Sequence, residues 1–158
     1  MQINGEKVYL FNPWQIKRWT EDEIQTKVNE LIKAYNPEID TPYGISLNIE
    51  TIANIQYLYG EMIARLTEEV SDLKLKTDSK EAKEIVRTRK NWDKDNPGEK
   101  KPAMSFFEAE ASEIVQDERA KQYEKEGILK RFKYAYDSFE SKANALKKRL
   151  EAIRIEEF

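Results

Sequence analysis

The sequence contains no histidine and no cysteine. Their absence excludes, within this chain, a disulfide framework, a thiol nucleophile, a zinc site of the usual kind and an imidazole base. The five glycines are scattered, so there is no glycine-rich loop that could wrap a phosphate in backbone N–H groups. Since most common kinds of catalyst are removed in this way, we expect a protein that is not an enzyme and that has no cofactor or metal.

Long apolar runs are also missing. No run approaches the roughly 20 residues that span a bilayer, and the N-terminus has no signal-peptide core, so we expect a soluble, cytoplasmic protein. Of the 158 residues, 36% are charged, which is a high share for a compact globule. Such a composition favours long helices whose apolar positions meet along seams.

The chain is expected to form a single helical domain of the all-α class. We predict an N-terminal arm at residues 1–19, a first helical part at 20–90, a linker at 91–104 and a long C-terminal helix at 105–158. The long helices would form an antiparallel helical hairpin or coiled coil. The arm is expected to resemble a short β-hairpin, because Asn4-Gly5 favours a type I′ turn between extended residues. Trp14 and Trp19 would dock it onto the helices.

Local signals refine these elements. Thr20 and Glu23 form a capping-box pattern that predicts the start of the first helix, and Asn36-Pro37 ends it. A second helix should begin near residues 46–48 and reach about residue 75, where the sequence permits either a continuation or a separate short helix. Ser105 and Glu108 form a second capping-box pattern before the C-terminal helix. In that helix Gly127 is the candidate position for a bend.

An apolar ladder near the C-terminus keeps an unbroken alternation of three- and four-residue spacings, which is typical of a coiled-coil seam. Its members, which we call the C-terminal seam, are Leu129, Phe132, Tyr136, Phe139, Ala143, Leu146, Leu150 and Ile153. All of them except Ala143 are candidate oligomerisation residues. The sequence leaves open whether the long helices pack within one chain or between copies.

Charge is distributed unevenly along the chain. Residues 80–101 carry eight cations and five anions, residues 128–149 carry seven and two, and residues 104–128 between them carry three and seven. Aromatic rings are mixed into the basic segments, a combination that can neutralise phosphates while a base stacks on a ring. The candidate nucleic-acid-binding residues are Lys80, Lys83, Arg87, Arg89, Lys90, Trp92, Lys130, Arg131, Lys133 and Tyr134. Alternatively, Trp92 lies in the core and Tyr134 covers a neighbouring subunit.

The order of these segments resembles the UvsY-type recombination mediators of tailed phages. The resemblance covers roughly residues 50–155 and rests on a helix that leads into a basic segment, a polar linker and a long final helix. It is carried by Tyr59, Gly60, Glu61, Met62, Ala64 and Leu66, by Glu-Ala-Glu-Ala-Ser-Glu-Ile-Val-Gln-Asp-Glu at residues 108–118, and by Tyr-Asp-Ser-Phe-Glu-Ser-Lys-Ala-Asn-Ala-Leu-Lys-Lys-Arg-Leu at residues 136–150.

The resemblance implies a homo-oligomer that binds single-stranded DNA and helps load a recombinase onto DNA covered by single-strand-binding protein. It implies DNA contact by Lys80, Lys83, Arg87, Arg89 and Lys90, and assembly through the C-terminal helix. A net charge of -3 departs from what DNA binding would favour. The alternative function is a helical adaptor or inhibitor that binds another protein through its acidic face, residues 108–126, and does not bind DNA.

Overall fold

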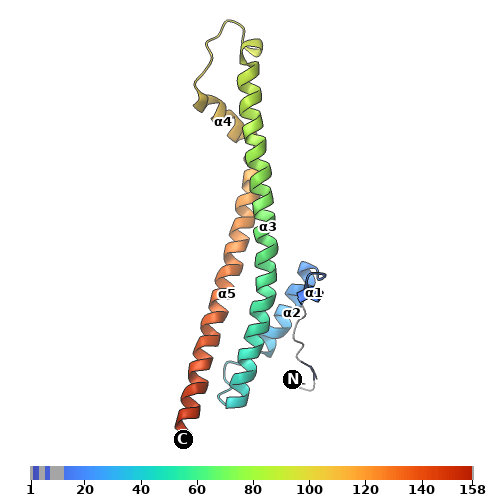
Figure 1. Ribbon diagram of the computed structural model, residues 1–158, viewed down its shortest axis with the longest axis vertical. Coiled ribbons are helices and arrows are strands. Elements are labelled where there is room, and N and C mark those ends of the chain that lie inside the picture. Colours follow the sequence, from blue (N-terminus) through green and yellow to red (C-terminus); the bar gives the residue numbers. More distant parts are fainter. Residues whose placement is uncertain (1, 4–5, 8–12, 158) are drawn as a thin grey trace. The chain divides into compact units, whose positions relative to one another are not determined.

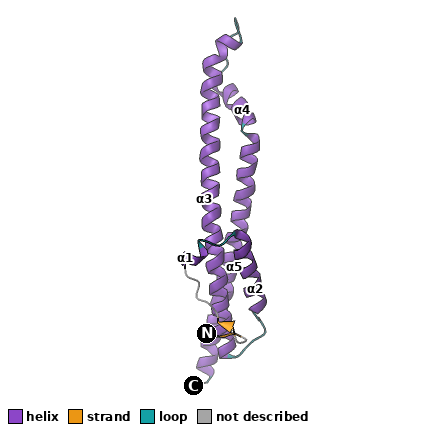
Figure 2. Ribbon diagram, turned by 90° about the vertical axis from the view of Figure 1, so that its right-hand side faces the viewer, coloured by secondary structure: helices purple, strands orange, loops and turns teal. Residues whose placement is uncertain are grey.

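The computed structural model describes residues 2–3, 6–7 and 13–157, and these form an all-α protein with one pair of very short strands (Figures 1 and 2). The elements are β1 (Gln2–Ile3), β2 (Glu6–Lys7), α1 (Pro13–Ile16), α2 (Glu21–Ala34), α3 (Pro42–Asp95), α4 (Met104–Ile114) and α5 (Gln116–Glu156). The predicted fold class is therefore confirmed. Within the described ranges, no helix combines the length and the apolar character that crossing a membrane requires.

The N-terminal arm contains the expected antiparallel pair. Gln2 lies opposite Lys7, and Ile3 lies opposite Glu6. The Asn4-Gly5 turn and the side chain of Trp14 lie outside the described part of the structure, whereas Trp19 packs against the apolar core as predicted.

The chain divides into two compact units. One contains Met1–Arg65 and Lys130–Phe158, and the other contains Leu66–Leu129. We call them the terminal unit and the central unit. Both α3 and α5 contribute residues to each unit, and α4 belongs to the central unit.

The core of the terminal unit is built by α1, α2 and the first part of α3. Its buried side chains are Ile16, Ile24, Val28, Ile55, Leu58 and Met62, and the partly buried Trp19, Leu31, Tyr59, Phe132 and Phe139 pack against them. The i, i+4 spacing of Ile24 and Val28 gives α2 one apolar face, as the sequence predicts. The backbone carbonyl of Ile16 accepts a hydrogen bond from Arg65, which ties α1 to α3.

The capping box at the start of α2 is confirmed. The hydroxyl of Thr20 accepts a hydrogen bond from the backbone N–H of Glu23 at 3.2 Å, and the Glu23 carboxylate accepts one from the backbone N–H of Thr20 at 3.2 Å. Two N–H groups that would otherwise lack a partner in the first turn are thereby satisfied. The helix ends at Ala34, and its C-cap residue Tyr35 directly precedes the predicted Asn36-Pro37 terminator.

In the structure, members of the C-terminal seam contact helix α3 of the same chain. In the terminal unit the Tyr59 ring lies 5.5 Å from Phe132 and 5.9 Å from Phe139, and Gln56 donates a hydrogen bond to the backbone carbonyl of Tyr136. The helices run antiparallel, because the partner's number on α5 falls from 149 to 136 as the residue number rises from Asp40, just before α3, to Gln56 on α3. Arg149 is fastened to Asp40 by two hydrogen bonds of 2.9 and 2.8 Å.

In the central unit polar contacts join α3 to α5. Lys125 pairs with Glu69 at 3.0 Å, Lys80 pairs with Glu118, and Arg119 reaches both Asp78 and Glu81 at 2.7 Å. Residue numbers again run in opposite directions on the two helices. The buried apolar side chains of α4 are Phe107 and Ala111, and Phe107 lies against Trp92 of α3.

Helix α3 is longer than predicted. It is continuous to Asp95, so residues 91–95 of the expected linker 91–104 are helical and the connection to α4 is only residues 96–103. No glycine or proline occurs between Gly60 and Pro97, and Trp92 is held by aromatic neighbours, so nothing ends the helix before Asn96-Pro97-Gly98.

Two local predictions for the C-terminal half are wrong. Helix α4 begins at Met104, with Ala103 as a cap that makes no side-chain hydrogen bond, so Ser105 and Glu108 do not form a capping box. The predicted long helix is interrupted at Val115, whose φ and ψ are -96° and 11°, and α5 continues through Gly127 without a break. Val115 is buried, and we find no sequence signal that marks the interruption there.

Replacing Thr20 by alanine should lower the free energy of unfolding by about 1 kcal/mol, because the N3 amide of α2 loses its acceptor. Urea unfolding followed by circular dichroism measures the change. Thr26→Ala is the matched control, because Thr26 is exposed within the same helix and should tolerate alanine without loss. Equal destabilisation by the two substitutions would contradict the assigned cap.

Two glycines should respond to alanine in opposite directions. A Cβ atom at Gly127 would meet nothing within 4 Å, so Gly127→Ala should stabilise α5 by about 1 kcal/mol through its higher helix propensity. A Cβ atom at Gly44 would collide with the Ile39 side chain, so Gly44→Ala should destabilise the terminal unit. Thermal unfolding of both variants tests this, and a stabilised Gly44→Ala protein would refute the close approach.

Candidate nucleic-acid interface

The basic segment of the central unit forms a regular row along α3. The row keeps alternating four- and three-residue spacings, so its members share one face of the helix. We call it the α3 cationic ladder, and its members are Lys76, Lys80, Lys83, Arg87, Lys90 and Lys94. All six side chains are exposed. Between the first and the last, the helix rises about 27 Å at about 1.5 Å per residue.

Two ladder members have acidic partners. The Lys80 ammonium pairs with Glu118 of α5, and Arg87 pairs with Glu84 one turn earlier on α3 at 2.7 Å. The other four, Lys76, Lys83, Lys90 and Lys94, make no ion pair or hydrogen bond with any residue in the described part of the chain. The ladder is therefore only partly neutralised from within the protein.

Like charges three and four residues apart on a helix repel one another, so the ladder is a destabilising arrangement for α3 on its own. The two ladder members with acidic partners change pKa values locally. Hydrogen bonding from Lys80 lowers the pKa of the Glu118 carboxyl, and hydrogen bonding to Glu84 raises the pKa of Arg87. An external polyanion lying along this face would relieve the repulsion among the remaining cations.

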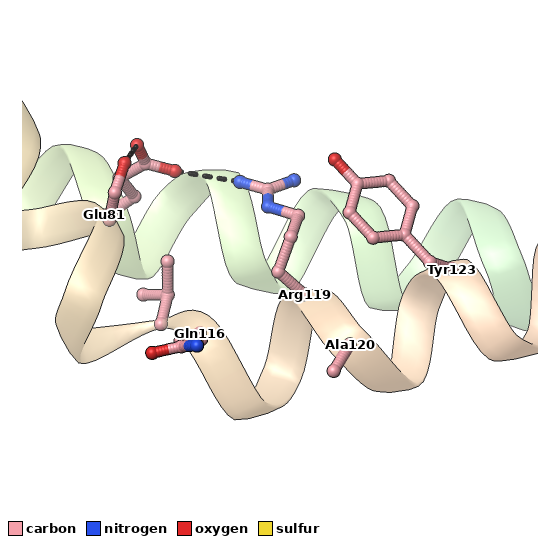
Figure 3. Close-up of a pocket in the computed structure, with 7 residues that line it drawn as sticks. Glu81, Gln116, Arg119, Ala120 and Tyr123 are labelled. Carbon is pink, nitrogen blue, oxygen red and sulfur yellow. Dashed lines mark hydrogen bonds and ion pairs between the residues drawn. The ribbon is translucent and has the colours of Figure 1, made fainter.

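Arg119 of α5 joins this helix to α3 through hydrogen bonds to residues outside the ladder. Its guanidinium donates to Asp78 and Glu81 at 2.7 Å and to the Gln122 side chain at 3.0 Å. Figure 3 shows the shallow hollow beside it, with Arg119 directed at Glu81 and Tyr123 at its edge. Because the donors of Arg119 are directed at two carboxylates and an amide, this hollow is not an obvious anion site. Asp78 and Glu81 thus hold α5 and do not cap a separate helix.

Trp92 lies in an aromatic cluster in the central unit. Its ring centroid is 5.7 Å from that of Phe106 and 5.9 Å from that of Phe107, both edge to face. The indole Nε1 is buried and has no hydrogen-bond partner among the residues that the structure describes. Of the two interpretations that the sequence allowed, the structure places Trp92 in the packed cluster, where the indole holds α4 against the end of α3.

The second basic segment lies on α5 in the terminal unit. Lys130, Arg131 and Lys133 are exposed, and none of them forms an ion pair with a described residue. Tyr134 beside them is 63% exposed. These four residues are off the C-terminal seam, as predicted, and together they present cations around an uncovered ring.

The candidate oligomerisation residues are buried or half-buried by contacts within their own chain. Leu129 and Leu150 are buried to 9% exposure, while Phe132 and Phe139 pack on the core of the terminal unit. Tyr136, Leu146 and Ile153 are half-buried. The half-buried members keep part of their surface accessible, and the assembly role of the seam stays a prediction.

Sequence reasoning missed the two ends of the ladder, Lys76 and Lys94. The periodicity that reveals the apolar seam would have found them, had it been applied to cations as well. Arg89, which was predicted to act with the other cations, lies off the ladder because it follows Arg87 by only two residues.

Within the described part of the chain, no cluster of three or more acidic side chains is arranged to hold a metal ion. A comparison of the chain with protein-family models, with curated proteins and with solved structures finds no match.

The ion pair between Lys80 and Glu118 should make the free energy of unfolding depend on pH. Because Lys80 lowers the folded-state pKa of Glu118 below its usual value of 4.5, the pair stabilises the fold above about pH 4.5 and loses its effect as the pH falls through the folded-state pKa. Glu118→Gln should therefore be less stable than the parent at pH 7, and the difference should be smaller at pH 3.

Urea unfolding at the two pH values measures this. The control is Glu124→Gln, which removes an exposed carboxylate of α5 that has no ion-pair partner among the described residues. A gap between parent and Glu118→Gln that stays constant with pH would contradict the linkage.

Proposed function

We propose that this chain is a non-enzymatic recombination accessory protein that binds single-stranded DNA and helps load a recombinase. The observation that carries the proposal is the α3 cationic ladder, a straight row of six exposed cations of which four have no partner among the described residues. A row of this kind suits a ligand whose negative charges also repeat along a line. A nucleic-acid backbone is such a ligand.

The physical basis is counterion release. Each phosphate that meets a lysine or arginine frees a condensed cation, so affinity falls as salt rises, with a log–log slope of about -0.7 per contact for single strands. A ligand that engages all six ladder cations would give a slope of about -4. The local concentration of positive charge on one face offsets the net charge of -3 of the whole chain, because screening confines the interaction to about 10 Å at 0.1 M salt.

The exposed ring of Tyr134 supports single-stranded over duplex DNA as the ligand. Unpaired bases can stack on an uncovered aromatic ring, whereas paired bases are enclosed in the helix. Lys130 and Arg131 lie four and three residues before Tyr134 on α5, where their charges flank the ring. We assign this patch to the terminal unit as a second contact, separate from the ladder.

The recombinase and the single-strand-binding protein are assigned as partners on the resemblance of residues 50–155 to UvsY-type mediators. The proposal does not need the C-terminal seam as an assembly surface. It needs only that the ladder faces solvent, so that its cations are accessible to a strand.

Fluorescence-anisotropy titration of labelled oligo-dT tests the DNA role. Lys83→Ala with Lys90→Ala removes two unpartnered ladder cations, so the salt slope should fall by about 1.4 and the affinity at 0.1 M salt by about 20-fold. The matched control is Lys74→Ala with Lys121→Ala, which removes the same charge from exposed positions of the central unit outside the ladder. The control should lose far less affinity.

Equal losses for the two pairs would mean that only total charge matters, which contradicts a binding site on the ladder. No binding of oligo-dT by the parent protein would reject the DNA role altogether. In that case the adaptor function becomes the better explanation, since α4 presents Glu108, Glu110 and Glu113 without ion-pair partners among the described residues.

A further inference from the structure

One member of the α3 cationic ladder also takes part in the packing of α5. The Lys80 ammonium pairs with the carboxylate of Glu118, which belongs to the first turn of α5. The other partnered member, Arg87, pairs with Glu84 of its own helix, so that pair joins no two elements. At Lys80, therefore, a ligand on the ladder would meet a contact between α3 and α5.

The direction of charge distinguishes this pair from the other ion pairs between the two helices. In the pair of Lys125 with Glu69 and in the two pairs of Arg119, the cation lies on α5 and the carboxylate on α3. In the pair of Lys80 with Glu118 the cation lies on α3 and the carboxylate on α5. Among the described ion pairs between α3 and α5, an anionic ligand on α3 could thus replace a carboxylate only at Lys80.

Few buried side chains hold α5 against α3 at this level. Between residues 67 and 95 of α3 the only buried side chain is that of Thr77, and between residues 116 and 128 of α5 it is that of Gln122. Both side chains are polar, and the residues are 2% and 3% exposed. The ion pairs are therefore a substantial part of what holds the start of α5 against α3.

The pair is accessible enough for a ligand to displace it. The side chains of Lys80 and Glu118 are 47% and 38% exposed. Ion pairs with this exposure contribute little to stability, because water already solvates both charges. The Glu118 carboxyl nonetheless responds to its partner, since hydrogen bonding from Lys80 lowers its pKa. A phosphate oxygen is also an anionic acceptor, so it can accept the N–H donors of the lysine in place of the carboxylate.

We propose that Glu118 competes with the anionic ligand of the ladder for Lys80, and that binding of the ligand releases the start of α5 from α3. This inference rests on the proposed function, because it concerns the same ladder. While the ion pair is formed, Lys80 is occupied by the carboxylate. Once a phosphate holds Lys80, the carboxylate loses its partner and faces added negative charge. Ligand binding and the helix contact therefore weaken each other to the same extent.

Oligo-dT titration of the full chain by fluorescence anisotropy tests the competition. Glu118→Gln keeps the size of the side chain but removes its charge, so affinity should rise about three-fold, which is the scale of an exposed ion pair. Asp117→Asn is the matched control, because it removes the same charge from the neighbouring exposed position, which has no ion-pair partner among the described residues. The control should raise affinity much less.

A double-mutant cycle separates competition for Lys80 from general repulsion between Glu118 and phosphates. In a Lys80→Met background the lysine is absent, so Glu118→Gln should leave the affinity nearly unchanged. General repulsion would instead give the same gain in both backgrounds. Circular dichroism checks that each variant is folded.

Hydrogen exchange measures the effect of the ligand on the helix contact. Saturating oligo-dT should speed amide exchange at residues 116–122 of the parent by about three-fold, whereas a ligand that only covers a surface would slow it. In Glu118→Gln the ion pair is already absent, so oligo-dT should cause no such increase. Exchange in the core of the terminal unit should stay the same.

Equal affinities of the parent and Glu118→Gln would overturn this inference and leave the DNA role intact. So would equal gains in the two backgrounds, or exchange at residues 116–122 that oligo-dT does not speed. Failure of the parent to bind oligo-dT would instead reject the proposed function, and this inference with it.

Discussion

The antiparallel packing of α3 against α5 is the interaction on which the other features depend. Its chemistry differs between the two units. In the terminal unit the aromatic rings of Tyr59, Phe132 and Phe139 pack against one another and against an aliphatic core. This packing stabilises the unit because it removes apolar surface from water. In the central unit the helices are joined largely by ion pairs such as those of Arg119. The more exposed pairs of this unit, such as Lys125 with Glu69, contribute little each and weaken with salt.

This difference explains what each unit can present. A unit whose cohesion comes from an apolar core has few apolar side chains to spare. The central unit has fewer buried apolar residues, so it can keep Leu75 and Val86 outside and carry a row of cations on α3. Its organisation depends on a few well-placed contacts, of which the clamp of Arg119 and the aromatic cluster around Trp92 are the most specific.

The parts of the fold that could be predicted from sequence are those fixed by neighbours along the chain. The Thr20 cap involves atoms three residues apart, and the C-terminal seam is a repeated local spacing. Features that depend on residues far apart in sequence were not accessible in this way. Trp92 extends α3 because it meets Phe106 and Phe107, and the interruption at Val115 has no local signature. Lys76 and Lys94 could have been assigned to the ladder from local sequence, because the cations repeat at three- and four-residue spacings. A search for hydrophobic periodicity alone does not detect that repeat.

The make-up of the cationic ladder has a consequence for how any ligand would be released. It contains only lysine and arginine, and the chain has no histidine, the side chain whose charge most readily changes near neutral pH. The ladder therefore lacks the residue type by which proteins commonly couple binding to small changes of pH. A bound polyanion could be displaced by ionic strength or by a competing polymer of higher charge density.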